Sequence, residues 1–77
     1  MGEYTLDNLN ISEKARVKRL CLNSGMEKRL RDFGFSYDTL IQCVGESILK
    51  DPKAFLIKGA VVALRRKDCQ GIEVKKL

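Results

Sequence analysis

The chain has 77 residues, of which 44% are hydrophobic and 32% are charged. A chain of this size buries only about 60% of its unfolded surface. We therefore expect a single small domain, residues 1–77, without a deep catalytic cleft between domains. The net charge of +5 permits an acidic protein, a nucleic acid or an anionic surface as partner and decides among none of them.

The sequence predicts a cytoplasmic protein that does not insert into the membrane. No apolar run approaches the roughly 20 residues of a membrane-spanning helix. The opening residues M-G-E-Y-T-L-D contain acids and no apolar core, so we expect no signal peptide. Leu6 stands where the myristoylation pattern requires Ser or Thr.

The N-terminal segment predicts one tight turn over residues 5–9. We expect Thr5 to cap this turn, Leu6 and Leu9 to dock on the body of the domain, and Ile11 to add a further apolar anchor.

Residues 14–22 predict the first strand. Ala15 and Val17 alternate with charged residues, which is typical of a strand with one face in water. The apolar residues then change from odd-numbered to even-numbered positions, at Leu20 and Leu22. This change of parity indicates a β-bulge.

A short helix begins near residue 24. Met26, Leu30 and Phe33 recur at i, i+4 and i+7, so we expect them to form the core-facing stripe of the helix. Basic residues fill the remaining faces: Lys28, Arg29 and Arg31.

The helix has recognisable ends. Gly34 follows the last periodic residue, where a left-handed conformation stops a helix at little steric cost. Either Asn23 or Ser24 is the expected N-cap, with Glu27 as the capping-box partner of Ser24.

The rest of the chain predicts four more strands, at 39–46, 54–58, 61–66 and 72–75, with a loop over 47–53 and a single helical turn over 65–71. Lys58 and Gly59 form the expected hairpin turn. The residues expected to point inward are Ile41, Cys43, Phe55, Ile57, Val62, Leu64, Ile72 and Val74.

These elements predict a mainly β fold: a small antiparallel barrel of about five strands with one short α-helix inserted after the first strand. Closing the sheet removes exposed edges, which suits so short a chain. SH3-like and OB-like barrels are the two options, and the final hairpin, helical turn and closing strand favour the SH3-like one.

The chain lacks the residues of common catalytic and metal sites. It contains no histidine and no C-x-x-C pair, and its acids fall mostly in turns. We expect no enzymatic activity, no cofactor and no metal site; any metal would have to use thiolates or surface acids. The three cysteines, Cys21, Cys43 and Cys69, are expected to be small apolar fillers.

Nucleic-acid binding is the alternative from another functional class. Basic residues group on the first strand, on the helix and over 65–67. A single-strand surface normally adds exposed aromatic side chains for base stacking. The pattern assigns Phe33, Phe35 and Phe55 to the core, so we expect no specific nucleic acid, while a small basic nucleic-acid-binding barrel stays open.

The order of several segments resembles the ferrous iron transport protein A (FeoA) family. They are the helix M-E-K-R-L-R-D-F-G-F, D-T-L-I-Q-C-V, the Asp51-Pro52 loop and A-L-R-R-K-D-C-Q-G-I-E-V, together with the opening T-L-D-N-L. The resemblance extends over nearly the whole chain. The sequence departs from the family at Tyr37-Asp38, where P-G is usual, and at Lys50, where G precedes D-P.

The resemblance implies an SH3-like barrel without enzymatic activity that acts with the membrane GTPase FeoB in bacterial ferrous iron uptake. The same barrel is found as the C-terminal domain of iron-dependent repressors, so a stand-alone regulatory domain is a further alternative.

If the chain acts as an adaptor of FeoB, we expect this partner to contact exposed helix positions together with one loop, all at one end of the barrel. These residues are Lys28, Arg29, Arg31, Tyr37, Ile48, Leu49, Asp51 and Pro52. Ile48 and Leu49 either contact the partner or tuck back on the core.

Overall fold

The computed structural model describes residues 4–49 and 51–77. The strands are β1 (Lys14–Leu20), β2 (Leu40–Glu46), β3 (Lys53–Ile57), β4 (Ala60–Leu64) and β5 (Ile72–Lys76). The helical elements are a 3₁₀ turn η1 (Leu6–Asn8), helix α1 (Ser24–Asp32) after β1, and a one-turn helix α2 (Arg66–Cys69) before β5. The predicted mainly β fold with a helix after the first strand is confirmed.

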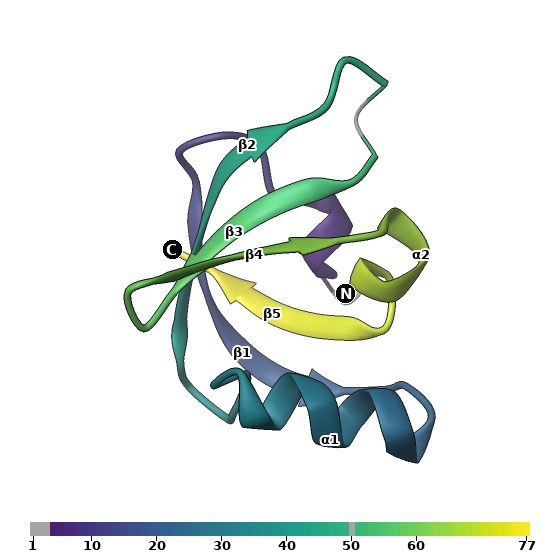
Figure 1. Cartoon of the computed structure of the whole chain (residues 1–77). Coiled ribbons are helices and arrows are strands. Elements are labelled where there is room, and N and C mark those ends of the chain that lie inside the picture. The colour runs from purple at the N-terminus through teal and green to yellow at the C-terminus, as the bar shows by residue number, and fades with distance from the viewer. Residues whose placement is uncertain (1–3, 50) are drawn as a thin grey trace.

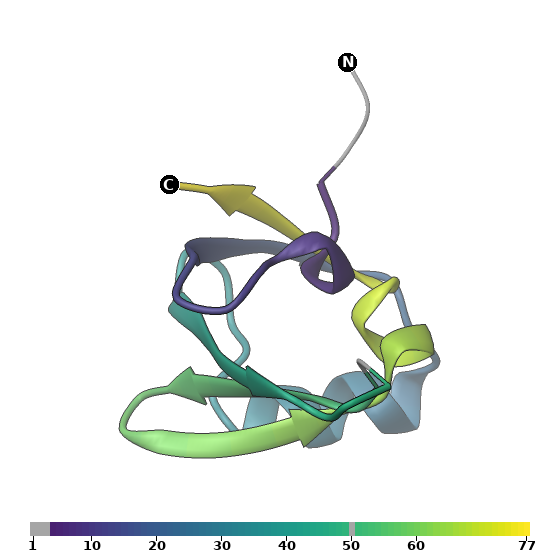
Figure 2. The same cartoon turned by 90° about the horizontal axis from the view of Figure 1, so that it is seen from above.

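All five strands form one antiparallel sheet in the order β4-β3-β2-β1-β5. The sheet curls around the core, so that β5 and β4 lie on opposite sides when seen from above (Figures 1 and 2). Its shape is barrel-like, but β4 and β5 remain the two edges of the sheet. Within residues 4–49 and 51–77 the sheet is therefore not closed by the expected pairing between its edge strands.

The core is built from the inward positions of the strands. The predicted inward residues are buried except Val62, which is partly buried against the core. The core is completed by residues of the 3₁₀ turn and its C-cap, of α1 and the segment after it, and of α2: Leu6, Leu9, Leu30, Phe35 and Cys69. Among the described residues these helices are too short and polar to cross a membrane.

The parity change predicted in the first strand is confirmed as a register shift between Val17 and Arg19 against β5. Beyond the shift, Leu20 pairs with Ile72. The predicted hairpin turn is also confirmed, because Lys58 and Gly59 have φ values of 49° and 81°. Two positive φ values are what a two-residue hairpin turn of type I′ requires.

The N-terminal prediction is confirmed in part. Thr5 occupies the N-cap position of η1, but its side chain donates to the carboxylate of Asp7 and makes no capping hydrogen bond to the turn. The expected apolar anchor at Ile11 is wrong: this side chain is half-exposed, because it lies in a tight turn beside Ser12, whose φ is 79°. Leu6 and Leu9 are fully buried, as expected.

Gly71, between α2 and β5, lies where no side chain fits. An added Cβ would stand 2.3 Å from Leu22 Cδ2 and 2.9 Å from the Cys21 carbonyl oxygen. The same backbone is fixed by a 2.6 Å hydrogen bond from Cys21 N–H to Gly71 O. We expect Gly71→Ala to lower the free energy of unfolding by about 1–3 kcal/mol, as overpacking does.

Urea denaturation measures this change, with Gly25→Ala as the matched control. The Cβ added at Gly25 has its nearest neighbour at 3.5 Å, and Ala is the better helix former. An equal loss of stability in both variants would contradict the steric explanation.

Candidate partner-binding surfaces

The start of α1 is fixed by Asn23, which resolves the two N-cap options. Asn23 Oδ1 accepts a hydrogen bond of 2.9 Å from Met26 N–H. Glu27 is one residue too late for a capping box with Asn23, and its Oε2 accepts from Leu22 N–H at 3.2 Å. The predicted Ser24–Glu27 box is therefore wrong, although Glu27 still holds the chain that enters α1.

The end of α1 is a Schellman motif, as Gly34 predicted. Gly34 has φ 108° and its N–H donates to Arg31 O at 2.9 Å. Phe35 N–H donates to Leu30 O at 2.9 Å, and both of these side chains are buried. The hydrogen bond between these two buried residues anchors the last turn of α1 to the core.

The basic face of α1 is in solvent. Lys28, Arg29 and Arg31 are exposed. Arg31 Nη2 lies 3.3 Å from Glu27 Oε1, one helical turn away. An exposed pair of this kind contributes little to stability, so this face carries positive charge available to a partner.

Phe33 is not a core residue, which corrects the predicted stripe. Leu30 is 1% exposed and Met26 is partly buried, whereas Phe33 is 51% exposed. Phe33 occupies the C-cap with φ −81° and ψ −7°, so it stays on the same side of α1 as Met26 and Leu30, but at the end of that stripe its side chain is left half in solvent. With Met26 and Val62 it lines a groove of about 230 Å³ between α1 and β4.

Tyr37 is 78% exposed and lies near the basic face of α1. Together with Arg31 it lines a hollow of about 280 Å³, whose other wall is the end of β1 with Lys18 and Arg19. The structure thus places Arg31 and Tyr37, two of the expected contact residues, at the same hollow.

The loop between β2 and β3 projects two large apolar side chains into solvent. Ile48 is 99% exposed and Leu49 is 86% exposed. Of the two options for this pair, tucking back on the core is wrong. We call Ile48 and Leu49 the loop tip.

The base of this loop is held by hydrogen bonds. Ser47 Oγ donates to Asp51 O at 2.8 Å and accepts from Asp51 N–H at 3.0 Å, and Ser47 N–H donates to Pro52 O at 3.2 Å. Asp51 Oδ1 also accepts from Arg66 N–H at 2.8 Å, which ties the loop to α2. Asp51 and Pro52 therefore fasten the loop, while the loop tip is presented to solvent.

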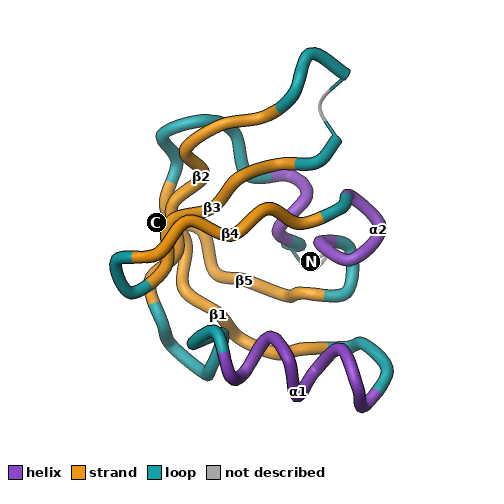
Figure 3. The backbone as a smooth tube through the Cα atoms, viewed as in Figure 1, coloured by secondary structure: helices purple, strands orange, loops and turns teal. Residues whose placement is uncertain are grey.

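The predicted contact residues do not lie at one end of the molecule. The loop between β2 and β3 is at one end of the sheet and α1 at the other (Figures 1 and 3). Strand periodicity places residues on faces but does not say which ends of a curled sheet meet. The eight residues therefore fall on two separate surfaces, the basic face of α1 with Tyr37 and the loop tip with its base.

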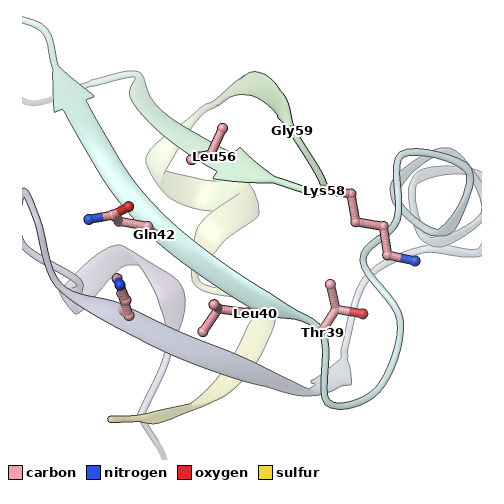
Figure 4. A pocket seen from close by; sticks show the side chains of 7 residues that line it. Thr39, Leu40, Gln42, Leu56, Lys58 and Gly59 are labelled. Carbon is pink, nitrogen blue, oxygen red and sulfur yellow. The ribbon is translucent and has the colours of Figure 1, made fainter.

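A third feature was missed by sequence reasoning. An open hollow of about 610 Å³ lies on the outer face of the sheet, and Leu40 and Leu56 project into it from neighbouring strands with Gln42 beside them (Figure 4). The charged groups that line it are Lys14 and Lys58. Leu40 alternates with inward Ile41, which was the available signal that it points outward.

Two of the three cysteines, Cys43 and Cys69, are buried in the core. Burial raises the pKa of the Cys43 thiol and raises that of Cys69 to about 12, so both are protonated and inert. Cys21 is exposed after the end of β1, so it is not the apolar filler that was expected. No group of three metal-ligating side chains is found in residues 4–49 and 51–77.

Solved structures with the same fold include proteins of ferrous iron transport. The FeoA protein of Chlorobium tepidum superposes with a TM-score of 0.91 at 24% identity, over 96% of this chain and 70% of its own. Iron(II) transport protein A of Clostridium thermocellum gives 0.90 at 28% identity, over 96% of this chain and 46% of its own.

A zinc complex of Stenotrophomonas maltophilia FeoA, described as an SH3 domain protein, gives a TM-score of 0.83 at 22% identity, over 94% of this chain and 89% of its own. The fold is therefore SH3-like, as predicted. No curated protein sequence matches the chain. The sequence model of the FeoA domain matches residues 4–76. The chain belongs to the FeoA family, which is associated with ferrous iron transport.

Proposed function

We propose that this chain is a non-enzymatic accessory protein of bacterial ferrous iron uptake that acts in the cytoplasm by docking on a FeoB-type membrane GTPase transporter. The observation that carries the proposal is the FeoA match over residues 4–76. The name of the Clostridium thermocellum relative, iron(II) transport protein A, and the description of the Stenotrophomonas maltophilia protein as possibly a ferrous iron transport activating factor support it.

The loop tip is the surface we assign to this docking. Fully burying one large aliphatic side chain contributes about 1.5–3 kcal/mol. Ile48 and Leu49 are almost fully exposed in the isolated chain, so a partner that buries them would gain nearly all of this free energy. The hydrogen-bonded base of the loop limits the entropy that binding would cost. The basic face of α1 lies at the other end and supplies charge for a second contact or for steering.

Ferrous iron uptake in a bacterium whose own copy of this gene is deleted tests the proposal. We expect the wild-type chain to restore uptake and the double variant Ile48→Ser/Leu49→Ser to restore much less. Ile11→Ser, which changes a half-exposed apolar residue in another turn, serves as the control and should restore uptake fully. Normal uptake in the deletion strain, with its transporter intact, would contradict the proposal.

A titration with labelled single-stranded RNA separates this function from the nucleic-acid alternative. With a net charge of +5 we expect weak binding at low salt that disappears at physiological salt. Micromolar binding that survives physiological salt would favour the nucleic-acid function instead.

A further inference from the structure

The two edges of the sheet are protected very differently. At β5, Val74 N–H donates to Tyr4 O at 2.8 Å, and Thr5 forms an isolated antiparallel β-bridge with Glu73. The N-terminal segment therefore covers part of that edge. Lys75 and Lys76 add charge there. At the other edge, β4 (Ala60–Leu64) reads A-V-V-A-L, without a charged residue, glycine or proline. Proteins normally protect an edge strand with such residues, because an exposed apolar edge pairs with other chains.

The hairpin geometry identifies which groups of β4 face outward. Ile57 and Ala60 flank the two-residue turn and form its closing pair, so their backbones are hydrogen-bonded to each other. In an antiparallel ladder the hydrogen-bonded pairs alternate with non-bonded pairs. Val61 and Ala63 belong to the non-bonded pairs, so their N–H and C=O groups point away from β3 toward the open edge.

A groove runs along this open edge. Its floor and one wall come from β4 through Val62, Ala63 and Leu64, and the other wall is α1. Met26, Leu30 and Phe33 line the α1 side. Figures 1 and 2 show α1 and β4 on the same side of the molecule, running in opposite directions. Its volume of about 230 Å³ is below the roughly 300–1,000 Å³ of small-molecule pockets, which suits a single anchoring side chain.

The charges at the groove mouth select the occupant. Arg29 and Arg65 line it and are exposed, and Asp68 at the α2 end is the one acid among the lining residues. A second copy of this chain would bring its own β4 together with the same arginines and a net charge of +5, which opposes self-pairing. An acidic partner is attracted by the same groups.

We propose that the groove between α1 and β4 binds an extended peptide segment of a partner protein by β-strand addition. The segment pairs with the outward groups of Val61 and Ala63, places one apolar side chain against Met26 and Phe33, and carries acidic residues that meet Arg29 and Arg65. Main-chain hydrogen bonds supply affinity in this mode, and the side-chain pocket supplies specificity. The site is separate from the loop tip, so it stands or falls independently of the proposed docking on the transporter.

Nuclear magnetic resonance titration of the ¹⁵N-labelled chain tests the proposal directly. The probe is a short blocked peptide of alternating valine and threonine with aspartate at both ends. We expect saturable shifts at the amides of Val61, Ala63 and Phe33, with slower hydrogen exchange at Val61 and Ala63. The matched probe with lysine in place of aspartate should bind at least about tenfold more weakly, equivalent to 1.4 kcal/mol.

Ala63→Pro removes one outward N–H group and leaves the ladder to β3 intact, as edge strands tolerate. This variant should bind the aspartate peptide at least about tenfold more weakly than the wild-type chain does. If this variant does not fold, Arg29→Glu/Arg65→Glu, which leaves β4 unchanged, should reverse the preference between the two peptides.

Absence of shifts at Val61 and Ala63 at millimolar peptide would overturn the proposal. Shifts at those amides that depend on protein concentration without peptide would overturn it in favour of a second copy of the chain.

Discussion

Replacing Leu30 by alanine is expected to lower the free energy of unfolding by about 2–5 kcal/mol, the range for truncating a buried leucine. Leu30 is 1% exposed and belongs to the single buried cluster that α1 shares with the sheet. Its carbonyl also accepts the Phe35 N–H that closes the end of α1. Because small domains have only about 5–15 kcal/mol of stability in total, the variant should show a large drop in denaturation midpoint.

Phe33→Ala is the control for this prediction, since Phe33 lies on the same stripe by sequence periodicity. It is half-exposed at the C-cap, so its truncation should cost no more than about 1 kcal/mol. Urea denaturation of both variants decides between the structure and the sequence pattern. A cost at Phe33 equal to that at Leu30 would mean that α1 is rotated relative to the position described.

The second large effect is expected for binding rather than for stability. Ile48→Ser/Leu49→Ser should weaken docking on the transporter by at least about 2 kcal/mol, or roughly thirtyfold, as loss of a hot spot does. The melting temperature should stay nearly unchanged, because both side chains are in solvent in the isolated chain. Ile11→Ser should change neither quantity. A large loss of melting temperature in the double variant would show that the loop tip is packed on the domain.

Local rules explain why most of the fold could be predicted from the sequence. Ala15 and Val17 lie inward because strand side chains alternate, and the parity change after them is a bulge. Gly34 ends α1 because a left-handed residue is needed there. Each of these features depends on neighbours within a few residues, so the pattern carries the information.

The features that were missed depend on tertiary arrangement. Phe33 keeps the helical period but lies at the end of the stripe, so its side chain is left half in solvent. The separation of the loop tip from α1 follows from how the sheet curls, which no local pattern encodes. The groove at β4 likewise exists only because α1 returns beside a strand that is more than 25 residues later in the chain. The expected contact residues therefore stay a prediction from the sequence, and only the structure shows that they fall on two separate surfaces.

Calorimetric titration of the purified chain into the purified cytoplasmic domain of a FeoB-type transporter, at physiological salt, tests the central claim most directly. We expect saturable binding with a dissociation constant in the micromolar range or tighter, corresponding to about −8 kcal/mol, and weaker binding for Ile48→Ser/Leu49→Ser. No measurable binding by the wild-type chain, or equal binding by the double variant, would contradict docking through the loop tip.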